Sequence, residues 1–95
     1  MRLPPLNALR VFHAVGSTSS IRSAAAELGV SHTAVARHIK ELEGWFGTRL
    51  VETTAHGTAL NAEGRRLHGS VSDAFALIAQ ATAEIRPPGQ SMELR

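Results

Sequence analysis

Residues 21–40 constrain the fold of this chain more than any other stretch. Two short helical patterns, each preceded by a serine that can cap a helix, are separated there by Gly29. Glycine adopts the left-handed backbone that ends a helix without a steric penalty, so Gly29 predicts a tight turn. The stretch therefore predicts helices over 21–28 and 32–46 joined by a short turn, which is a helix-turn-helix.

The predicted 32–46 helix has one apolar side, which is expected to face a core. Apolar residues recur along it at spacings of four, three and four, and Trp45 lies beside the last of them. Val30 is expected to fill the corner of the turn. The apolar stripe consists of Val35, Ile39, Leu42 and Phe46, and it is expected to meet Ala24, Ala25 and Leu28 of the preceding helix.

The segment before the helix-turn-helix predicts one more helix. Asn7 is a favourable capping residue, and apolar residues at helical spacing follow it over 8–15. The serine- and glycine-rich segment 16–20 predicts a loop, at the end of which Ser20 caps the next helix. Three consecutive helices are therefore expected in the first half of the chain.

The segment after the helix-turn-helix predicts a β-hairpin. β-Branched and apolar residues over 50–53 and 58–60 flank the dipeptide His56-Gly57, which is a turn signal. A short hairpin beside the second helix of a helix-turn-helix is a wing. The expected fold class is mainly α: a winged helix-turn-helix followed by a long linker or dimerisation helix.

That long helix is predicted over 62–85, with Asn61 as its cap. Its apolar residues repeat at spacings of 4, 3, 4, 3 and 4, which makes a seam of about three heptads. A helix of this length spans roughly 36 Å, more than a small core needs. Either the seam packs on its own domain or it pairs with a second copy, and we favour the second copy. The seam residues are Leu67, Val71, Ala74, Ile78, Ala81 and Ile85, with Phe75 widening the stripe.

Composition excludes several classes of protein. The 95 residues include no cysteine and no apolar run long enough to cross a membrane, so neither a disulfide framework nor a membrane partner is expected. No nucleophile motif, glycine-rich loop or carboxylate pair supports catalysis or a cofactor, and an enzyme is not expected. No metal site is expected either, because the histidines do not pair at helical spacing. They are His13, His32, His38, His56 and His68.

Charge and side-chain chemistry indicate nucleic acid as the partner. The net charge is +2, and residues 1–60 carry this excess, with six basic and four acidic side chains. The side of the 32–46 helix opposite its apolar stripe carries groups that suit a DNA groove. Arg37 can bind guanine through two hydrogen bonds or clamp a phosphate, and Lys40 suits a phosphate. The residues of this side are His32, Thr33, Ala36, Arg37 and Lys40.

With these parts in this order, the chain resembles the N-terminal DNA-binding domain of LysR-type transcriptional regulators. The resemblance covers about residues 3–86, and its opening is similar to the glycine-cleavage-activator branch. The stretches that carry it are LPPLNALRVF at 3–12, AAAELGVS at 24–31, AVARHIKELE at 34–43, GTRLV at 47–51 and LNAEG at 60–64.

The resemblance implies a homodimer formed by antiparallel linker helices, a tetramer in the full-length protein, and an interrupted palindrome in promoter DNA as the target. It implies a cytoplasmic bacterial protein that is associated with the nucleoid when bound to DNA. Such regulators continue into a domain that binds a small effector, so the chain is interpreted as a fragment that ends in the interdomain linker. The expected domains are a winged helix-turn-helix over 1–60, a linker helix over 61–86 and a linker or tail over 87–95.

The chain departs from the family's common residues at several expected contacts. His32 stands where Gln is common, and Ala36 where Ser is common. The wing carries Glu52, which repels phosphate, where basic residues are common, so weaker wing contacts are expected. The pair Arg22-Ser23 shifts a phosphate-binding cation by one residue. The full set of expected DNA contacts is Arg22, Ser23, Ser31, His32, Thr33, Ala36, Arg37, Lys40, Thr53 and His56.

Two alternatives to this interpretation stay open. One is another family of winged-helix regulators, against which the long heptad helix argues. The other is a helical interaction module in which the 62–85 helix docks on a protein and no DNA is involved.

Overall fold

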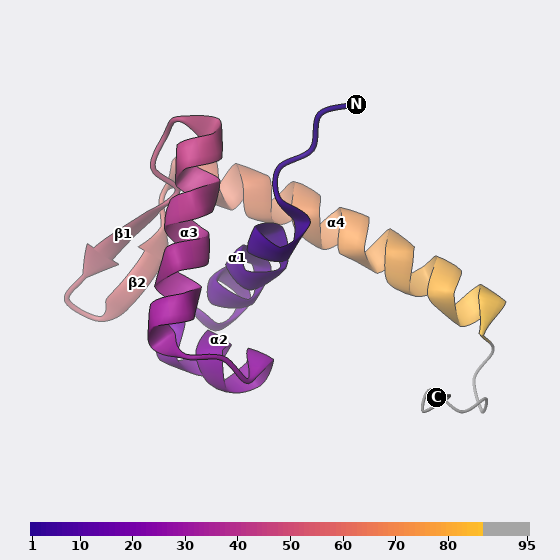
Figure 1. Cartoon of the computed structure of the whole chain (residues 1–95), viewed down its shortest axis with the longest axis horizontal. Helices are drawn as coiled ribbons and strands as arrows, with labels where there is room; N and C mark the ends of the chain where they lie inside the picture. Colours follow the sequence, from indigo (N-terminus) through magenta and orange to yellow (C-terminus); the bar gives the residue numbers. More distant parts are fainter. Residues whose placement is uncertain (87–95) are drawn as a thin grey trace.

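The computed structural model describes residues 1–86, so the predicted 87–95 tail lies outside the described residues. Within the described part, four helices surround a small core and a two-stranded hairpin projects from one side (Figure 1). The elements are α1 (Leu6–Thr18), α2 (Ile21–Leu28), α3 (His32–Phe46), β1 (Val51–Thr54), β2 (Gly57–Leu60) and α4 (Ala62–Ile85). The mainly α, winged helix-turn-helix class is confirmed, and α2, α3 and α4 have the predicted bounds.

The first helix is longer than predicted at both ends. It begins at Leu6, with Pro5 as its N-cap, and Asn7 lies inside it rather than capping it. Proline fits this position because its fixed backbone angle suits a helix entry, and the Pro5 carbonyl accepts from the Leu9 amide at 3.0 Å. The prediction that Asn7 caps the helix was therefore wrong.

The predicted 16–20 loop is mostly helical. The helix runs on to Thr18, whose hydroxyl donates to the Ala14 carbonyl at 2.8 Å, and only Ser19 adopts the left-handed backbone, with φ of 57°. Gly16 lies inside the helix, at the point where α4 crosses α1. A Cβ at Gly16 would lie 2.8 Å from Nε2 of His68 and closer still to Cδ2. This glycine marks a close approach of two helices, not a loop.

The first strand of the hairpin lies one residue later than predicted, and the second strand begins one residue earlier than predicted, at Gly57. Its ladder pairs Val51 with Leu60 and Thr54 with Gly57 in an antiparallel register. Leu50, predicted to begin the first strand, instead lies in the core. Because the Leu50 side chain is buried in the core, the hairpin projects from the domain only from Val51 onward.

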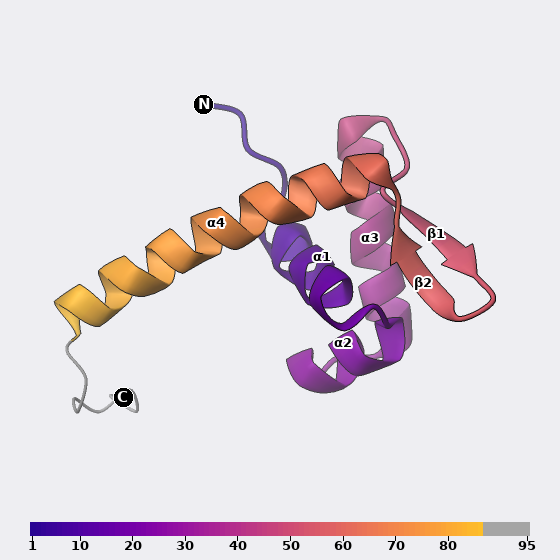
Figure 2. The same cartoon turned by 180° about the vertical axis from the view of Figure 1, so that it is seen from behind.

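The core is built around α1, with α2, α3 and α4 packed against it (Figure 2). The predicted inward residues of the helix-turn-helix are buried or half-buried only as far as Leu42 along α3, and Val30 in the turn is 40% exposed and does not fill the corner. Trp45 and Phe46 at the end of α3 are also partly exposed. The buried apolar residues are Ala8, Leu9, Val11, Phe12, Ala14, Val15, Ala24, Ala25, Val35, Ile39, Leu42, Leu50 and Val71.

The long helix α4 has two unlike halves. Its first half crosses α1, and its second half extends beyond the rest of the molecule in both views (Figures 1 and 2). Among the described residues, no helix has the length and hydrophobicity to cross a membrane.

Candidate nucleic-acid interface

Capping side chains fix the geometry of the helix-turn-helix as the sequence predicts. The Ser20 hydroxyl accepts from the Ser23 amide at 3.0 Å, and the Ser31 hydroxyl accepts from the Ala34 amide at 3.0 Å. Gly29 takes the left-handed backbone with φ of 70°, and the Val30 amide donates to the Ala25 carbonyl at 3.0 Å. These local bonds close the turn between α2 and α3 and so set the direction of α3.

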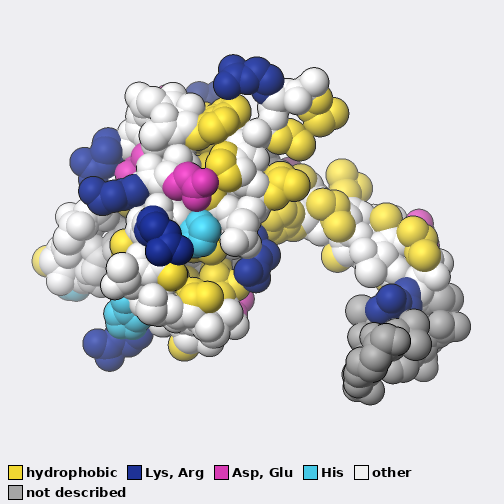
Figure 3. Space-filling model, in the orientation of Figure 1, with side chains coloured by type: hydrophobic (Ala, Val, Ile, Leu, Met, Phe, Trp, Pro, Cys, Tyr) yellow, Lys and Arg dark blue, Asp and Glu magenta, His cyan; other side chains and the backbone are white. Residues whose placement is uncertain are grey.

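The two sides of α3 differ as predicted. Val35, Ile39 and Leu42 are buried against α1 and α2. On the opposite side Ala36 is half-buried, and the remaining expected contacts are exposed: His32, Thr33, Arg37 and Lys40. At the start of α2, Arg22 and Ser23 are exposed as well. Lys and Arg side chains gather around α3 and beside the hairpin on the face shown in Figure 3.

The acidic residues of α3 are engaged by neighbours. The Glu41 carboxylate lies 3.3 Å from Nδ1 of His38, one turn before it. The Glu43 carboxylate turns toward the hairpin. No ion pair within residues 1–86 involves Arg37 or Lys40, so their cationic groups are available to an external anion.

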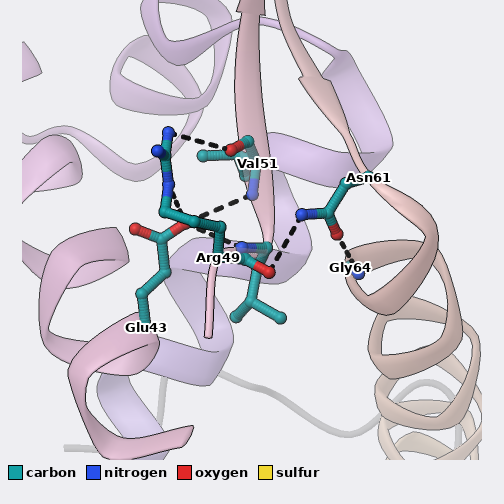
Figure 4. A network of polar contacts seen from close by, with 6 residues as sticks. Glu43, Arg49, Val51, Asn61 and Gly64 are labelled. Atoms are coloured by element: carbon teal, nitrogen blue, oxygen red, sulfur yellow. Dashed lines mark hydrogen bonds and ion pairs between the residues drawn. The ribbon is translucent and has the colours of Figure 1, made fainter. Parts of the chain in front are cut away.

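Glu43 holds the hairpin onto the end of α3 (Figure 4). One of its oxygens accepts from the backbone amides of Leu50 at 2.8 Å and Val51 at 3.2 Å. Arg49 lies 3.6 Å from the same oxygen and donates to the Val51 carbonyl at 3.3 Å. A half-buried carboxylate with two amide donors is a strong, directional anchor. It fixes the base of the wing relative to the exposed side of α3.

Asn61 ties the hairpin to α4 in the same region (Figure 4). Its side-chain oxygen caps α4 by accepting from the Gly64 amide at 2.8 Å, and its side-chain nitrogen donates to the Arg49 carbonyl at 2.9 Å. The Asn61 amide donates to the Leu50 carbonyl at 3.0 Å. A Cβ at Gly64 would collide with that Leu50 carbonyl, so only glycine permits this contact.

The sequence predicted Asn61 as a cap but missed the roles of Glu43 and Arg49. No contact was expected for Glu43. Its partners are backbone amides seven and eight residues later, which carry no sequence signal. The one sequence signal for a contact of Glu43 with the domain was its position directly after Leu42, which belongs to the apolar stripe of α3.

The tip of the hairpin offers few groups for binding. Thr53, His56 and Glu52 are exposed. The Thr54 hydroxyl is used within the turn, where it donates to the Gly57 carbonyl at 3.0 Å and accepts from the His56 amide at 3.2 Å. The wing therefore presents Thr53 and His56, as predicted, next to the acidic Glu52.

The predicted seam of α4 is divided between two environments. Val71 is 6% exposed in the domain's own core, and Leu67 and Phe75 pack against that core. Farther along, Ile78 is 61% and Ile85 is 85% exposed, and Ala74 and Ala81 are also exposed. The first half of the seam therefore packs on its own domain. The second half has no partner among the described residues.

No group of three or more metal-ligating side chains forms within residues 1–86. The histidines do contain one pair that the sequence could not reveal. His13 of α1 stacks on His68 of α4, across 55 positions of the chain.

Comparison with known proteins agrees with this geometry. Residues 6–65 match the model of the bacterial regulatory helix-turn-helix proteins of the lysR family. The chain is 42% identical over 84 residues to the HTH-type transcriptional regulator TrpI of Pseudomonas aeruginosa, which covers 88% of this chain and 28% of TrpI. It is 38% identical over 85 residues to the glycine cleavage system transcriptional activator of Escherichia coli K12, covering 90% of this chain and 28% of the activator.

Solved structures show the same fold. The complex of the CbnR DNA-binding domain with DNA superposes with a TM-score of 0.75 at 26% identity, over 86% of this chain and 94% of that one. The complex of the BenM DNA-binding domain with benA site 1 DNA gives a TM-score of 0.78 at 24% identity, over 86% of this chain and 95% of that one. The chain spans less than a third of the length of the curated relatives. Its sequence and fold place it in the LysR family of bacterial regulatory helix-turn-helix proteins.

Proposed function

We propose that this chain binds double-stranded promoter DNA in a sequence-specific manner and is the DNA-binding domain of a bacterial transcription regulator. The observation that carries the proposal is the exposed side of α3. It presents His32, Thr33, Arg37 and Lys40 from a helix whose opposite side is buried and whose direction is fixed by two caps. A recognition helix needs this combination, because base contacts require a rigid frame.

The proposed contacts divide into base-reading and phosphate-binding groups. Arg37 is proposed to bind guanine or a phosphate, His32 and Thr33 to bond to base edges, and Ala36 to contact a thymine methyl. The remaining residues are proposed to bind phosphates: Arg22, Ser23, Ser31, Lys40, Thr53 and His56. The two solved relatives supply support, since their names describe DNA-binding domains in complex with DNA.

A titration with generic duplex DNA at rising salt concentration tests the proposal. The logarithm of the affinity is expected to fall linearly with that of the salt concentration, with a slope of about −0.9 per phosphate contacted. A folded chain that binds no duplex at low salt would contradict the proposal and favour a helical protein-interaction module.

The second half of α4 supports the further proposal of a homodimer. Its exposed positions are self-complementary when two copies run antiparallel about a centre between residues 77 and 78. Leu77 then faces Ile78 of the second copy, and Ala74 faces Ala81. Both large side chains are more than half exposed in the single chain, which disfavours a monomer. The proposed interface is therefore Ala74, Leu77, Ile78, Ala81 and Ile85, while Leu67, Val71 and Phe75 support it from the core.

Cysteine cross-linking tests this register, since the chain contains no native cysteine. Ile78→Cys places two sulfur atoms beside the proposed two-fold axis and is expected to form an interchain disulfide under mild oxidation. Ala76→Cys, which is as exposed but lies on the opposite side of α4, is the matched control and is expected to remain a thiol. Equal cross-linking of both variants would contradict the register.

The wider role is part of the same proposal. Two copies joined through α4 suit an interrupted palindrome, because the helix pair sets the distance between the two recognition helices. We place the protein in the bacterial cytoplasm, as a tetramer when full-length. The role is binding rather than catalysis, and effector binding is assigned to a domain outside these residues.

A further inference from the structure

A stack of two histidine rings lies where α4 crosses α1. The rings of His13 and His68 are nearly parallel, at 12°, with centroids 5.0 Å apart. Phenylalanine edges border the stack: Phe75 lies 5.2 Å from His13, and Phe12 lies 6.2 Å from His68. The stack is the polar centre of an otherwise apolar contact between the two helices.

His68 is held in place by α1. Its Nε2 lies 3.3 Å from the His13 carbonyl oxygen and 3.2 Å from the Ser17 hydroxyl. Because a carbonyl oxygen only accepts, Nε2 must carry a hydrogen to bond it. Gly16 leaves the ring its space, since a Cβ there would collide with it. The position of His68 along α1 is therefore fixed by sterics and by hydrogen bonds.

The surroundings of His13 oppose a positive charge. Burial lowers the pKa of His13 below its ordinary value of 6.5, and the neighbouring His68 lowers it further. The Glu27 carboxylate of α2 acts in the opposite direction and raises it. At neutral pH His13 is therefore neutral, and a proton gained at lower pH is placed against a second imidazole ring.

The stack lies at the joint between the DNA-reading part of the domain and α4. Beyond Phe75 the residues of α4 are all exposed, so the direction of its second half depends on the contact with α1 (Figure 2). We propose that the His13–His68 stack is an acid-sensitive joint, in which a proton gained by the His13 ring weakens the packing of α4 on α1. Loosening changes the direction of the second half of α4 relative to α3.

The sign of the pH effect follows from linkage. The unfolded chain has His13 at its ordinary pKa, so it binds a proton at a higher pH than the folded chain does. The free energy of unfolding therefore falls as pH drops below about 6.5, and it stops falling once the folded pKa has been passed.

Distance measurements between two spin labels test the joint without DNA. The labels are placed at Gly44→Cys on α3, where a Cβ meets nothing within 4 Å, and at Gln80→Cys on the exposed half of α4. Labelled chain is diluted with unlabelled chain, so only distances within one chain are read. Between pH 7.5 and 5 the distance distribution is expected to shift or broaden reversibly. An unchanged distribution over the range in which NMR shows His13 to titrate overturns the proposal.

Three variants separate the joint from general acid effects. His13→Phe keeps an aromatic ring in the stack and removes the charge, so the distance response to pH is expected to disappear. Glu27→Gln removes the carboxylate that favours the proton, so the midpoint of the response is expected to move to lower pH. His56→Gln, at the exposed hairpin tip, is the matched control and leaves the response unchanged.

A distance response to pH that persists in His13→Phe, or a midpoint that Glu27→Gln does not move, contradicts the proposed joint. These readouts are independent of DNA affinity, so failure of the joint and failure of DNA binding are distinguishable.

Discussion

The two halves of α4 share one heptad pattern and have different surroundings. In the first half, Val71 is 6% exposed and the seam packs on α1. In the second half, Ile78 is 61% exposed and faces away from the described domain. The comparison shows that periodicity identifies the apolar side of a helix but not the molecule that covers it. That distinction depends on how far the domain reaches along the helix.

The largest expected effect is the loss of folding stability when a charge is introduced into the buried first half of α4. Val71→Asp places an unpaired carboxylate in the core, so the free energy of unfolding is expected to fall by several kcal/mol, on the order of the whole stability of a small domain. Circular dichroism during urea titration measures this effect. A folded Val71→Asp chain of near-normal stability would show that the first half of α4 is not part of the core.

A smaller effect is expected where α4 crosses α1. Gly16→Ala forces a methyl group into the ring of His68 and is expected to cost about 1–3 kcal/mol of stability. Gly69→Ala is the matched control, since a Cβ there meets nothing within 4 Å, and it is expected to stabilise α4 by about 0.5–1 kcal/mol. Thermal unfolding of the two variants under identical conditions gives opposite signs. The same sign for both would argue against a tight crossing.

The smallest effect on the fold is expected in the second half. Ile78→Asp changes an exposed side chain, so the unfolding of the domain itself is expected to change by less than about 0.5 kcal/mol. Sedimentation is expected to show a monomer for this variant and a dimer for the parent chain. A variant that stays dimeric would place the interface elsewhere.

Elements whose ends are set by local chemistry were predictable from the sequence. The caps Ser20, Ser31 and Asn61 and the left-handed Gly29 act within a few residues, and they gave the starts of α2, α3 and α4 and the end of α2. The α1 bounds were missed because Pro5 supports an entry one residue before the apparent cap, and because Gly16 serves a distant helix.

The exposed side of α3 was predictable because it lies opposite an apolar stripe whose residues recur at regular helical spacing. The contacts that hold the wing were not. Glu43 bonds to amides in the next element, and His13 meets His68 across 55 positions, so neither contact follows from helical period or local propensity. Which part of the heptad seam is buried also depends on the size of the core, which the seam itself does not encode.

Whether α3 reads DNA is decided by the affinity of an Arg37→Ala chain for duplexes selected from genomic fragments by the parent chain. Arg66→Ala is the matched control. It removes the same charge from α4 beside the C-terminal end of α3, where Arg66 lines a hollow with Phe46 and Thr48. Arg37→Ala is expected to lose about 1–3 kcal/mol of binding free energy on the selected duplex and less on generic duplex, and Arg66→Ala is expected to change little. Equal losses on both duplexes would assign Arg37 to phosphate alone, and unchanged affinity for every duplex would contradict the assignment of α3 as the reading helix.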